Sequence, residues 1–182
     1  GISTDMFGQQ LIDTLEASKV DPSHCIRSGH PTTLAFVKLT DGHATYSFFD
    51  ESSAGRMVSK SDLPAIPDTV NAMHFGAISL IPEPCGTAYE ALMRKNHAKT
   101  VISLDPNIRP GFITDTDGHR ARIQRMIAMA DIVKVSDEDL DWITNSGNRK
   151  AAIDQWIADG TSLVLLTKGA DGVTAFTASD EI

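Results

Sequence analysis

One short stretch of the sequence carries a carboxylate, an amide and a guanidinium within five residues. Asp105, Asn107 and Arg109 follow an apolar run of β-strand composition. Because the three residues alternate, an extended backbone would point their side chains the same way. Pro106 and Pro110 favour extended geometry in the residues before them. Ligands of open α/β sheets bind beyond the carboxyl ends of the strands, so this stretch is a candidate site.

A simpler interpretation is an ordinary turn at the end of a strand. In that case Asp105 caps local backbone groups and Arg109 is solvated. Taken by itself, the stretch favours this simpler interpretation. The rest of the sequence favours a functional site, because the ends of other predicted strands also carry polar or flexible residues.

Three other predicted strands end in this way, and they are followed by residues 76–79, 136–139 and 167–172. In a parallel sheet, such ends lie along one edge and can build one site. An arginine can hold phosphate oxygens, and carboxylates can hold Mg²⁺ directly or through water. A turn flanked by glycines lets backbone N–H groups approach a nucleotide. Together these groups suit phosphoryl transfer, which depends on positioning and charge stabilisation.

Each group also has a structural interpretation. Ser136 with Asp139 has the pattern of a helix N-cap, a role that can coexist with metal binding. The turn from Gly169 to Gly172 is also compatible with a plain tight connection, and it fits neither the P-loop nor the dinucleotide fingerprint. The six histidines show no metal-ligand spacing, and no G-x-S-x-G sequence is present.

The elements around these residues alternate between strand and helix. Strands are predicted at 72–76, 101–104, 132–135, 162–167 and 173–177, and helices at 83–97, 117–130, 137–144 and 149–158. This order predicts a parallel sheet with helices on its faces. Nearer the N-terminus, a helix begins directly after Ser3 to Asp5 with no strand before it. Runs at 32–39 and 44–49, joined by residues 40–43, predict a β-hairpin outside the sheet.

Length and composition fit one sizeable globular core. The chain has 182 residues, of which 41% are hydrophobic, and a net charge of -8. That charge argues against a nucleic-acid binder and against binding to an anionic membrane surface. Cys25 and Cys85 are too few for a disulfide framework and favour the cytoplasm. No apolar run is long enough to span a bilayer. The abrupt start and end of the pattern favour a fragment of a longer protein.

Four segments resemble motifs of the ribokinase-like (pfkB) carbohydrate kinases, in the bacterial fructokinase and 2-keto-3-deoxygluconate kinase branch. Gly1 with residues 5–8 is similar to the family's G-x-D-x-x-G helix start. Residues 105–109 match D-x-N-x-R, which is the most specific piece. Residues 133–139 resemble the segment with the N-x-x-E metal motif, and residues 166–173 resemble the nucleotide-binding V-T-x-G-x-x-G turn.

The resemblance implies a ribokinase-like Rossmann-type α/β sandwich. Its parallel core would occupy residues 71–182, and a small β lid would lie within about 25–55. The implied reaction transfers the γ-phosphoryl group of ATP to a sugar hydroxyl with the help of Mg²⁺. Arg109 would contact the sugar and the transferring phosphoryl, while Asp105 and Asn107 would shape that site.

The resemblance also assigns ligand-binding residues. Those for the nucleotide are Ser136, Thr167, Lys168, Gly169 and Gly172; Asp139 would bind the metal, and Thr32 and Asp50 would join Arg109 at the sugar. Ser136 and Asp139 replace the asparagine and glutamate of the metal motif, so the shorter carboxylate would reach the metal through water. Acidic residues at 50 and 51 would repel a sugar acid, which favours a neutral ketose such as fructose.

The family's G-A-G-D motif, which supplies the catalytic base, would lie beyond Ile182, and its glycine-rich N-terminal strand region before Gly1. A partial kinase domain without its base is therefore expected. Pairing of lid strands in the family also implies a homodimer. Three alternatives stay open: a kinase for 2-keto-3-deoxygluconate or another sugar, a noncatalytic sugar- or nucleoside-binding relative, and a nucleotide-binding α/β domain of another enzyme.

Overall fold

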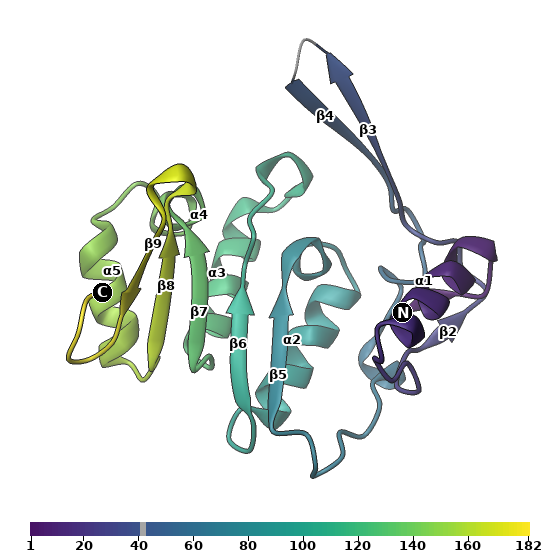
Figure 1. The fold of residues 1–182 in the computed structure, drawn as a ribbon, viewed down its shortest axis with the longest axis horizontal. Coiled ribbons are helices and arrows are strands. Elements are labelled where there is room, and N and C mark those ends of the chain that lie inside the picture. Colours follow the sequence, from purple (N-terminus) through teal and green to yellow (C-terminus); the bar gives the residue numbers. More distant parts are fainter. Residues whose placement is uncertain (41–42) are drawn as a thin grey trace. The chain divides into compact units, whose positions relative to one another are not determined.

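The computed structural model describes residues 1–40 and 43–182, which form two compact units (Figure 1). The smaller unit comprises residues 1–64 and 83–88. The larger unit comprises residues 65–82 and 89–182. Among the described residues, none of the helices has both the length and the apolar character needed to cross a membrane.

The smaller unit begins with a short strand, β1 (Ile2–Ser3), which pairs in parallel with β2 (Arg27–Ser28). The expectation that no strand precedes the first helix was therefore wrong, because a two-residue strand is too short to show a periodic pattern. Helix α1 (Met6–Ala17) follows, and the Asp5 side chain accepts the Gly8 N–H at 2.8 Å. This contact satisfies one of the unpaired N–H groups of the first turn.

The predicted hairpin is present as β3 (Leu34–Thr40) and β4 (His43–Phe49), antiparallel from Leu34↔Phe49 to Thr40↔His43. Residues 41 and 42 of its predicted turn lie outside the described residues. Phe36 and Phe49 meet edge to face, with 5.5 Å between ring centroids. The hairpin forms a two-stranded sheet of its own, and a short 3₁₀ helix, η1 (Lys60–Asp62), comes later in the unit.

The larger unit holds a five-stranded sheet in the order β5-β6-β7-β8-β9. Its strands are β5 (Ala72–Gly76), β6 (Val101–Asp105), β7 (Ile132–Ser136), β8 (Leu163–Thr167) and β9 (Val173–Phe176). The first four strands are parallel, and β9 is antiparallel to β8. The prediction of four parallel strands, with the hairpin in a separate sheet, is confirmed.

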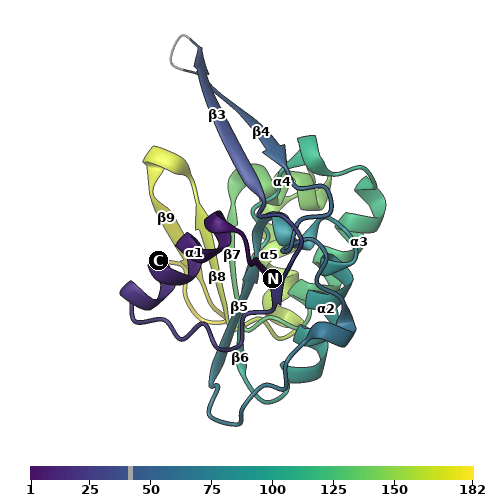
Figure 2. The same ribbon diagram turned by 90° about the vertical axis from the view of Figure 1, so that its right-hand side faces the viewer.

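Helices cover one face of this sheet in the larger unit (Figure 2). They are α3 (Thr116–Ile127), α4 (Asp137–Thr144), α5 (Arg149–Ala158) and the later part of α2 (Cys85–Asn96). Alternate strand residues, such as Leu104, Val133 and Val135, are fully buried in the core. The residues between them are only half-buried and are often polar, so the second face of the sheet carries the chemical groups.

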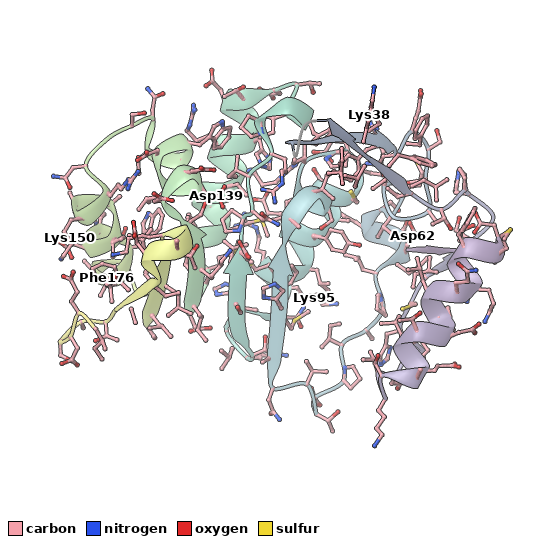
Figure 3. The ribbon with its side chains drawn as sticks, turned by 45° about the horizontal axis from the view of Figure 1, so that its top comes forward. Lys38, Asp62, Lys95, Asp139, Lys150 and Phe176 are labelled. Atoms are coloured by element: carbon pink, nitrogen blue, oxygen red, sulfur yellow. The ribbon has the colours of Figure 1, made fainter. Side chains whose placement is uncertain are left out.

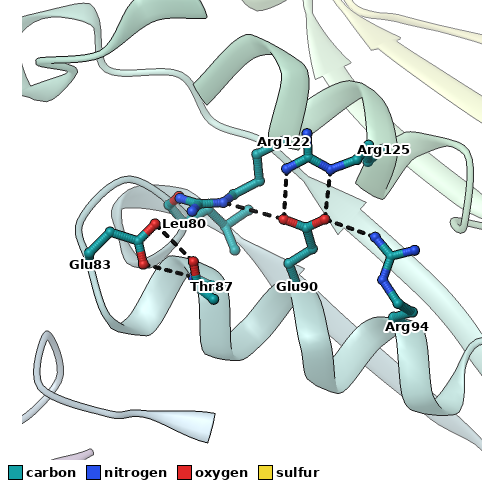
Figure 4. A network of polar contacts seen from close by, with 7 residues as sticks. All are labelled: Leu80, Glu83, Thr87, Glu90, Arg94, Arg122 and Arg125. Carbon is teal, nitrogen blue, oxygen red and sulfur yellow. Dashed lines mark hydrogen bonds and ion pairs between the residues drawn. The ribbon is translucent and has the colours of Figure 1, made fainter. Parts of the chain in front are cut away.

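A buried carboxylate joins α2 to α3. Glu90 is 9% exposed and accepts hydrogen bonds from Arg125 at 2.8 and 2.9 Å and from Arg94 at 3.0 Å (Figure 4). Arg122 approaches Glu90 at 3.6 Å and donates to the Leu80 carbonyl at 2.9 Å. The hydrogen bonds from Arg125 lower the pKa of Glu90 most strongly. Because unpaired buried charges are costly, this network fixes how the two helices pack.

The buried imidazole of His119 predicts acid sensitivity. Its ring lies 5.8 Å from the Trp142 ring, and burial, followed by the charge of Arg122, lowers the pKa of His119 to about 4. The unfolded chain therefore takes up this proton more readily, and stability falls as the pH drops from 6.5 towards 4. Between pH 7 and 5 we expect a loss on the order of 2 kcal/mol in the free energy of unfolding, measured with urea.

His119→Gln removes the titrating group, so its stability should depend less on pH over this interval. The matched control is His97→Gln, because His97 is exposed. A control that flattens the pH dependence as much as His119→Gln would contradict the assignment to His119.

Candidate active site

The predicted D-x-N-x-R stretch forms a turn at the carboxyl end of β6. Asp105 is the last residue of that strand, and Asn107 has a φ of 44°. The prediction of an extended backbone with three side chains pointing the same way is therefore wrong at Asn107. Asparagine is among the few residues that adopt left-handed geometry readily, so this residue type suits the reversal of the chain.

A buried hydrogen bond holds this turn to the next strand end. Ser136, which ends β7, caps α4 by accepting the Asp139 N–H at 3.0 Å, as the sequence pattern suggested. The Asp139 carboxylate, in a residue only 6% exposed, accepts the Ile108 N–H at 3.1 Å. Burial raises the pKa of Asp139, and the nearby charge of Asp105 contributes to the same shift. Figure 3 shows Asp139 among the elements of the larger unit.

Asp105 has a charged partner that the sequence analysis did not select. Lys134 lies in the middle of β7, and its ammonium is 3.0 Å from Oδ2 of Asp105. The signal in the sequence was a single lysine between Val133 and Val135. Alternation along the strand turns those valines into the core and the lysine towards the polar face.

Gly76 allows β5 and β6 to approach closely at this edge. It pairs with Asp105, and a Cβ at position 76 would lie 2.2 Å from the Asp105 carbonyl oxygen. No side chain fits at that distance. The neighbouring residue, Ala77, has a φ of 61°, so the chain leaves β5 through a strained position.

Arg109 is exposed, and its Nη1 donates to the carbonyl oxygen of Ile108 at 2.8 Å. This bond orients the guanidinium on its own turn. Within the described part of the chain, Arg109 has no carboxylate partner among the ion pairs. Its planar fork therefore remains suited to an anionic ligand.

A cavity of about 670 Å³ runs along β5, from Val70 before the strand to Ala77 after it. Its lining includes Asp105 and Asn107, residues 72–77, and the larger side chains of Tyr89 and Leu92. His74, which also lines it, shares a hydrogen bond of 3.1 Å with Ser103. The cavity thus combines apolar walls with a few polar groups, as small-molecule sites usually do.

The predicted nucleotide turn connects β8 to β9. Lys168 N–H donates to the Gly172 carbonyl at 2.8 Å, and the 3₁₀ helix η4 (Gly169–Asp171) lies between them. Gly169 and Gly172 have φ values of 55° and 88°, which favour glycine, and open space surrounds the Cβ position of each. Ser136 pairs with Thr167 in the sheet register, so the two strand ends are adjacent.

Thr32 and Asp50, predicted at the sugar, belong to the smaller unit. Thr32 donates to the Asp5 carboxylate from both its N–H and its hydroxyl, at 2.9 and 2.7 Å. Asp50 accepts from Thr33 and Ser53 at 2.9 and 2.8 Å. Both side chains therefore have structural partners within their own unit.

The carboxylates at the sheet edge do not form a closed metal site. In the described residues, no group of three or more histidine, cysteine or acidic side chains is placed to hold a metal ion. The Asp139 carboxylate accepts a hydrogen bond from the Ile108 N–H, and the Asp105 carboxylate forms an ion pair with Lys134.

The family model for pfkB family carbohydrate kinases matches residues 2–182. The chain belongs to this family. It is 55% identical over 177 residues to a fructokinase of Rhizobium leguminosarum bv. trifolii, and 34% identical over 179 residues to fructokinase-2 of Zea mays. These alignments cover 97% and 95% of the chain and 54% and 53% of the relatives. The chain therefore spans about half the length of these relatives.

Solved structures of fructokinases share the fold. A fructokinase from Xylella fastidiosa superposes with a TM-score of 0.90 at 25% identity, covering all of this chain and 60% of the other. A fructokinase from Vibrio cholerae, solved with fructose, ADP and a calcium ion, has a TM-score of 0.84 at 27% identity; 100% of this chain and 59% of the other are covered. The mainly parallel sheet flanked by helices is thus the fold of known fructokinases.

Proposed function

We propose that the protein containing these residues transfers the γ-phosphoryl group of ATP to a sugar hydroxyl, with fructose as its preferred acceptor. The observation that carries this proposal is the convergence of polar groups at one sheet edge. The turn after β6, the start of α4 after β7, and the glycine turn after β8 follow adjacent parallel strands. The 55% identity to a fructokinase supports the choice of fructose.

Each part of this edge has a distinct role in the proposal. Asp105 and Asn107 line the cavity and receive sugar hydroxyls there. The positive charge of Arg109 stabilises the negative charge on the transferring phosphoryl group. The nucleotide lies along the turn from Thr167 through Lys168 to Gly172, next to Ser136. In support, the Xylella fastidiosa fructokinase has been solved with bound ATP, at 26% identity and a TM-score of 0.88.

Mg²⁺ belongs to the same proposal, with Asp139 as the carboxylate that binds it through water. When bound, such an ion offsets the negative charge of the phosphate oxygens. The chain itself contributes the position of Asp139, which the Ile108 N–H fixes. A cytoplasmic location, where ATP is supplied, is also part of this proposal.

The choice of acceptor is tested with the full-length protein in an assay that measures sugar-dependent formation of ADP. We expect fructose to support turnover with a higher kcat/KM than 2-keto-3-deoxygluconate. The physical reason is one that the family resemblance implies: carboxylates at 50 and 51, at the place of the family's lid strand, would repel an anionic acceptor and accept neutral hydroxyls. A protein that uses only the sugar acid would refute this preference, and one that binds fructose without forming ADP would be a noncatalytic relative.

Arg109→Ala in the full-length protein should mainly lower kcat. Removal of one preorganised donor typically costs about 2–4 kcal/mol of transition-state stabilisation. Arg109→Lys should recover part of this loss, because an ammonium keeps the charge but not the planar fork. Steady-state kinetics and thermal melting of both variants provide the measurement.

Arg149→Ala is a suitable control, since Arg149 pairs on the surface with Asp141 at 2.6 Å. It should leave kcat unchanged. Near-normal turnover in Arg109→Ala would show that this arginine is only a surface group. A large drop in its melting temperature would instead assign it a structural role.

We also propose a homodimer formed through the β3–β4 hairpin. Phe36, Val37, Leu39 and Phe49 are all more than half exposed on it. A two-stranded sheet alone is marginally stable in water, and a second copy would cover these side chains. Light scattering should give twice the subunit mass, and Phe36→Ser with Leu39→Ser should shift it towards the monomer. A monomeric wild-type protein would contradict the dimer.

A further inference from the structure

We propose that Lys134 is a positioning residue for the sugar site, acting through its ion pair with Asp105. This inference rests on the proposed sugar kinase function, and it names a residue whose side chain does not line the cavity. Its basis is that two neighbouring carboxylates, Asp105 and Asp139, lie at this edge of the sheet, and the Lys134 ammonium pairs with one of them.

The position of Lys134 is unusual for a charged residue. It lies within an interior strand, between two valines that are fully buried. Because β6 and β7 pair from Ser103↔Ile132 to Leu104↔Val133, Lys134 is next to Asp105 in the register. Its side chain is 36% exposed and that of Asp105 is 23% exposed, so water screens the 3.0 Å ion pair only in part.

Asp105 depends on this lysine for its orientation. Oδ2 pairs with Lys134, whereas Oδ1 is buried and has no hydrogen-bond partner among the described groups. An ionised carboxylate with one unsatisfied oxygen stays in place only if its remaining contact is strong. Charge-assisted contacts of this kind are the strong ones.

A second carboxylate, that of Asp139, makes the orientation of Asp105 depend more strongly on the Lys134 ammonium. Asp139 is nearby, and its charge and that of Asp105 repel each other. Asp139 cannot move away easily, because it is buried and holds the Ile108 N–H. Without the ammonium of Lys134, Asp105 is therefore the group that turns away. Since Asp105 lines the cavity with Asn107, its movement would change the surface that receives the sugar.

The test compares Lys134→Met with Lys134→Arg in the full-length protein. Methionine keeps most of the length of the side chain and removes the charge. Lys134→Met should raise the KM for fructose about tenfold or more, because a fructose hydroxyl then loses its hydrogen bond to the charged Asp105 carboxylate. The KM for ATP should change less than about twofold. Lys134→Arg keeps the charge and should recover most of the affinity for fructose.

The matched control is Lys150→Met, which breaks an exposed ion pair with Asp154. It should leave both KM values unchanged. A double variant tests whether Lys134 acts through Asp105. If it does, Lys134→Met with Asp105→Asn should bind fructose no more weakly than Asp105→Asn alone, as measured by calorimetry without ATP.

Two results would overturn the inference while leaving the proposed function intact. One is a fructose KM that Lys134→Met does not change in an active enzyme. The other is an equal rise in the KM for fructose and ATP, with no recovery in Lys134→Arg, which would indicate a general structural role. If the wild-type protein phosphorylates no sugar, the proposed function fails first, and this inference fails with it.

Discussion

The hydrogen bond from the Ile108 N–H to the Asp139 carboxylate is the contact on which the candidate site depends. Ile108 anchors the turn after β6 in the core with 4% of its surface exposed, and Asp139 lies in the first turn of α4, after β7. The bond therefore joins two strand ends that lie 31 residues apart in the sequence. Both partners are buried, so losing either would leave an unsatisfied polar group, which is costly.

This contact places the carboxylates of Asp139 and Asp105 close together, and surrounding positive groups compensate for their negative charge. The positive end of the α4 dipole and the Lys134 ammonium both lie at this edge. Arg109 is held on the same turn by the Ile108 carbonyl. A compact set of fixed charges of both signs is the kind of environment in which a phosphoryl group can be positioned and stabilised. In this chain, the candidate site is thus built at the ends of β6 and β7.

Local signals in the sequence were sufficient to predict many of the strands and helices. Strand β5 and helices α4 and α5 have the predicted bounds; alternating apolar residues mark the strand, and the N-cap pattern at Ser136 marks the start of α4. The predictions failed where the signal was weak or non-local. Strand β1 has two residues and depends on pairing with β2, and Asn107 has a left-handed φ inside a stretch that otherwise has an extended pattern.

The sequence by itself determined the order of strands and helices, the identity of the polar residues at the strand ends, and the family resemblance. Only the tertiary structure decided which of those residues touch. Lys134 meets Asp105 because β6 and β7 are neighbours in one register, and Gly76 is needed because β5 approaches the Asp105 carbonyl. Such contacts depend on which strands pair, across about 30 residues of chain, and the periodicity of one strand does not say which strand is its neighbour.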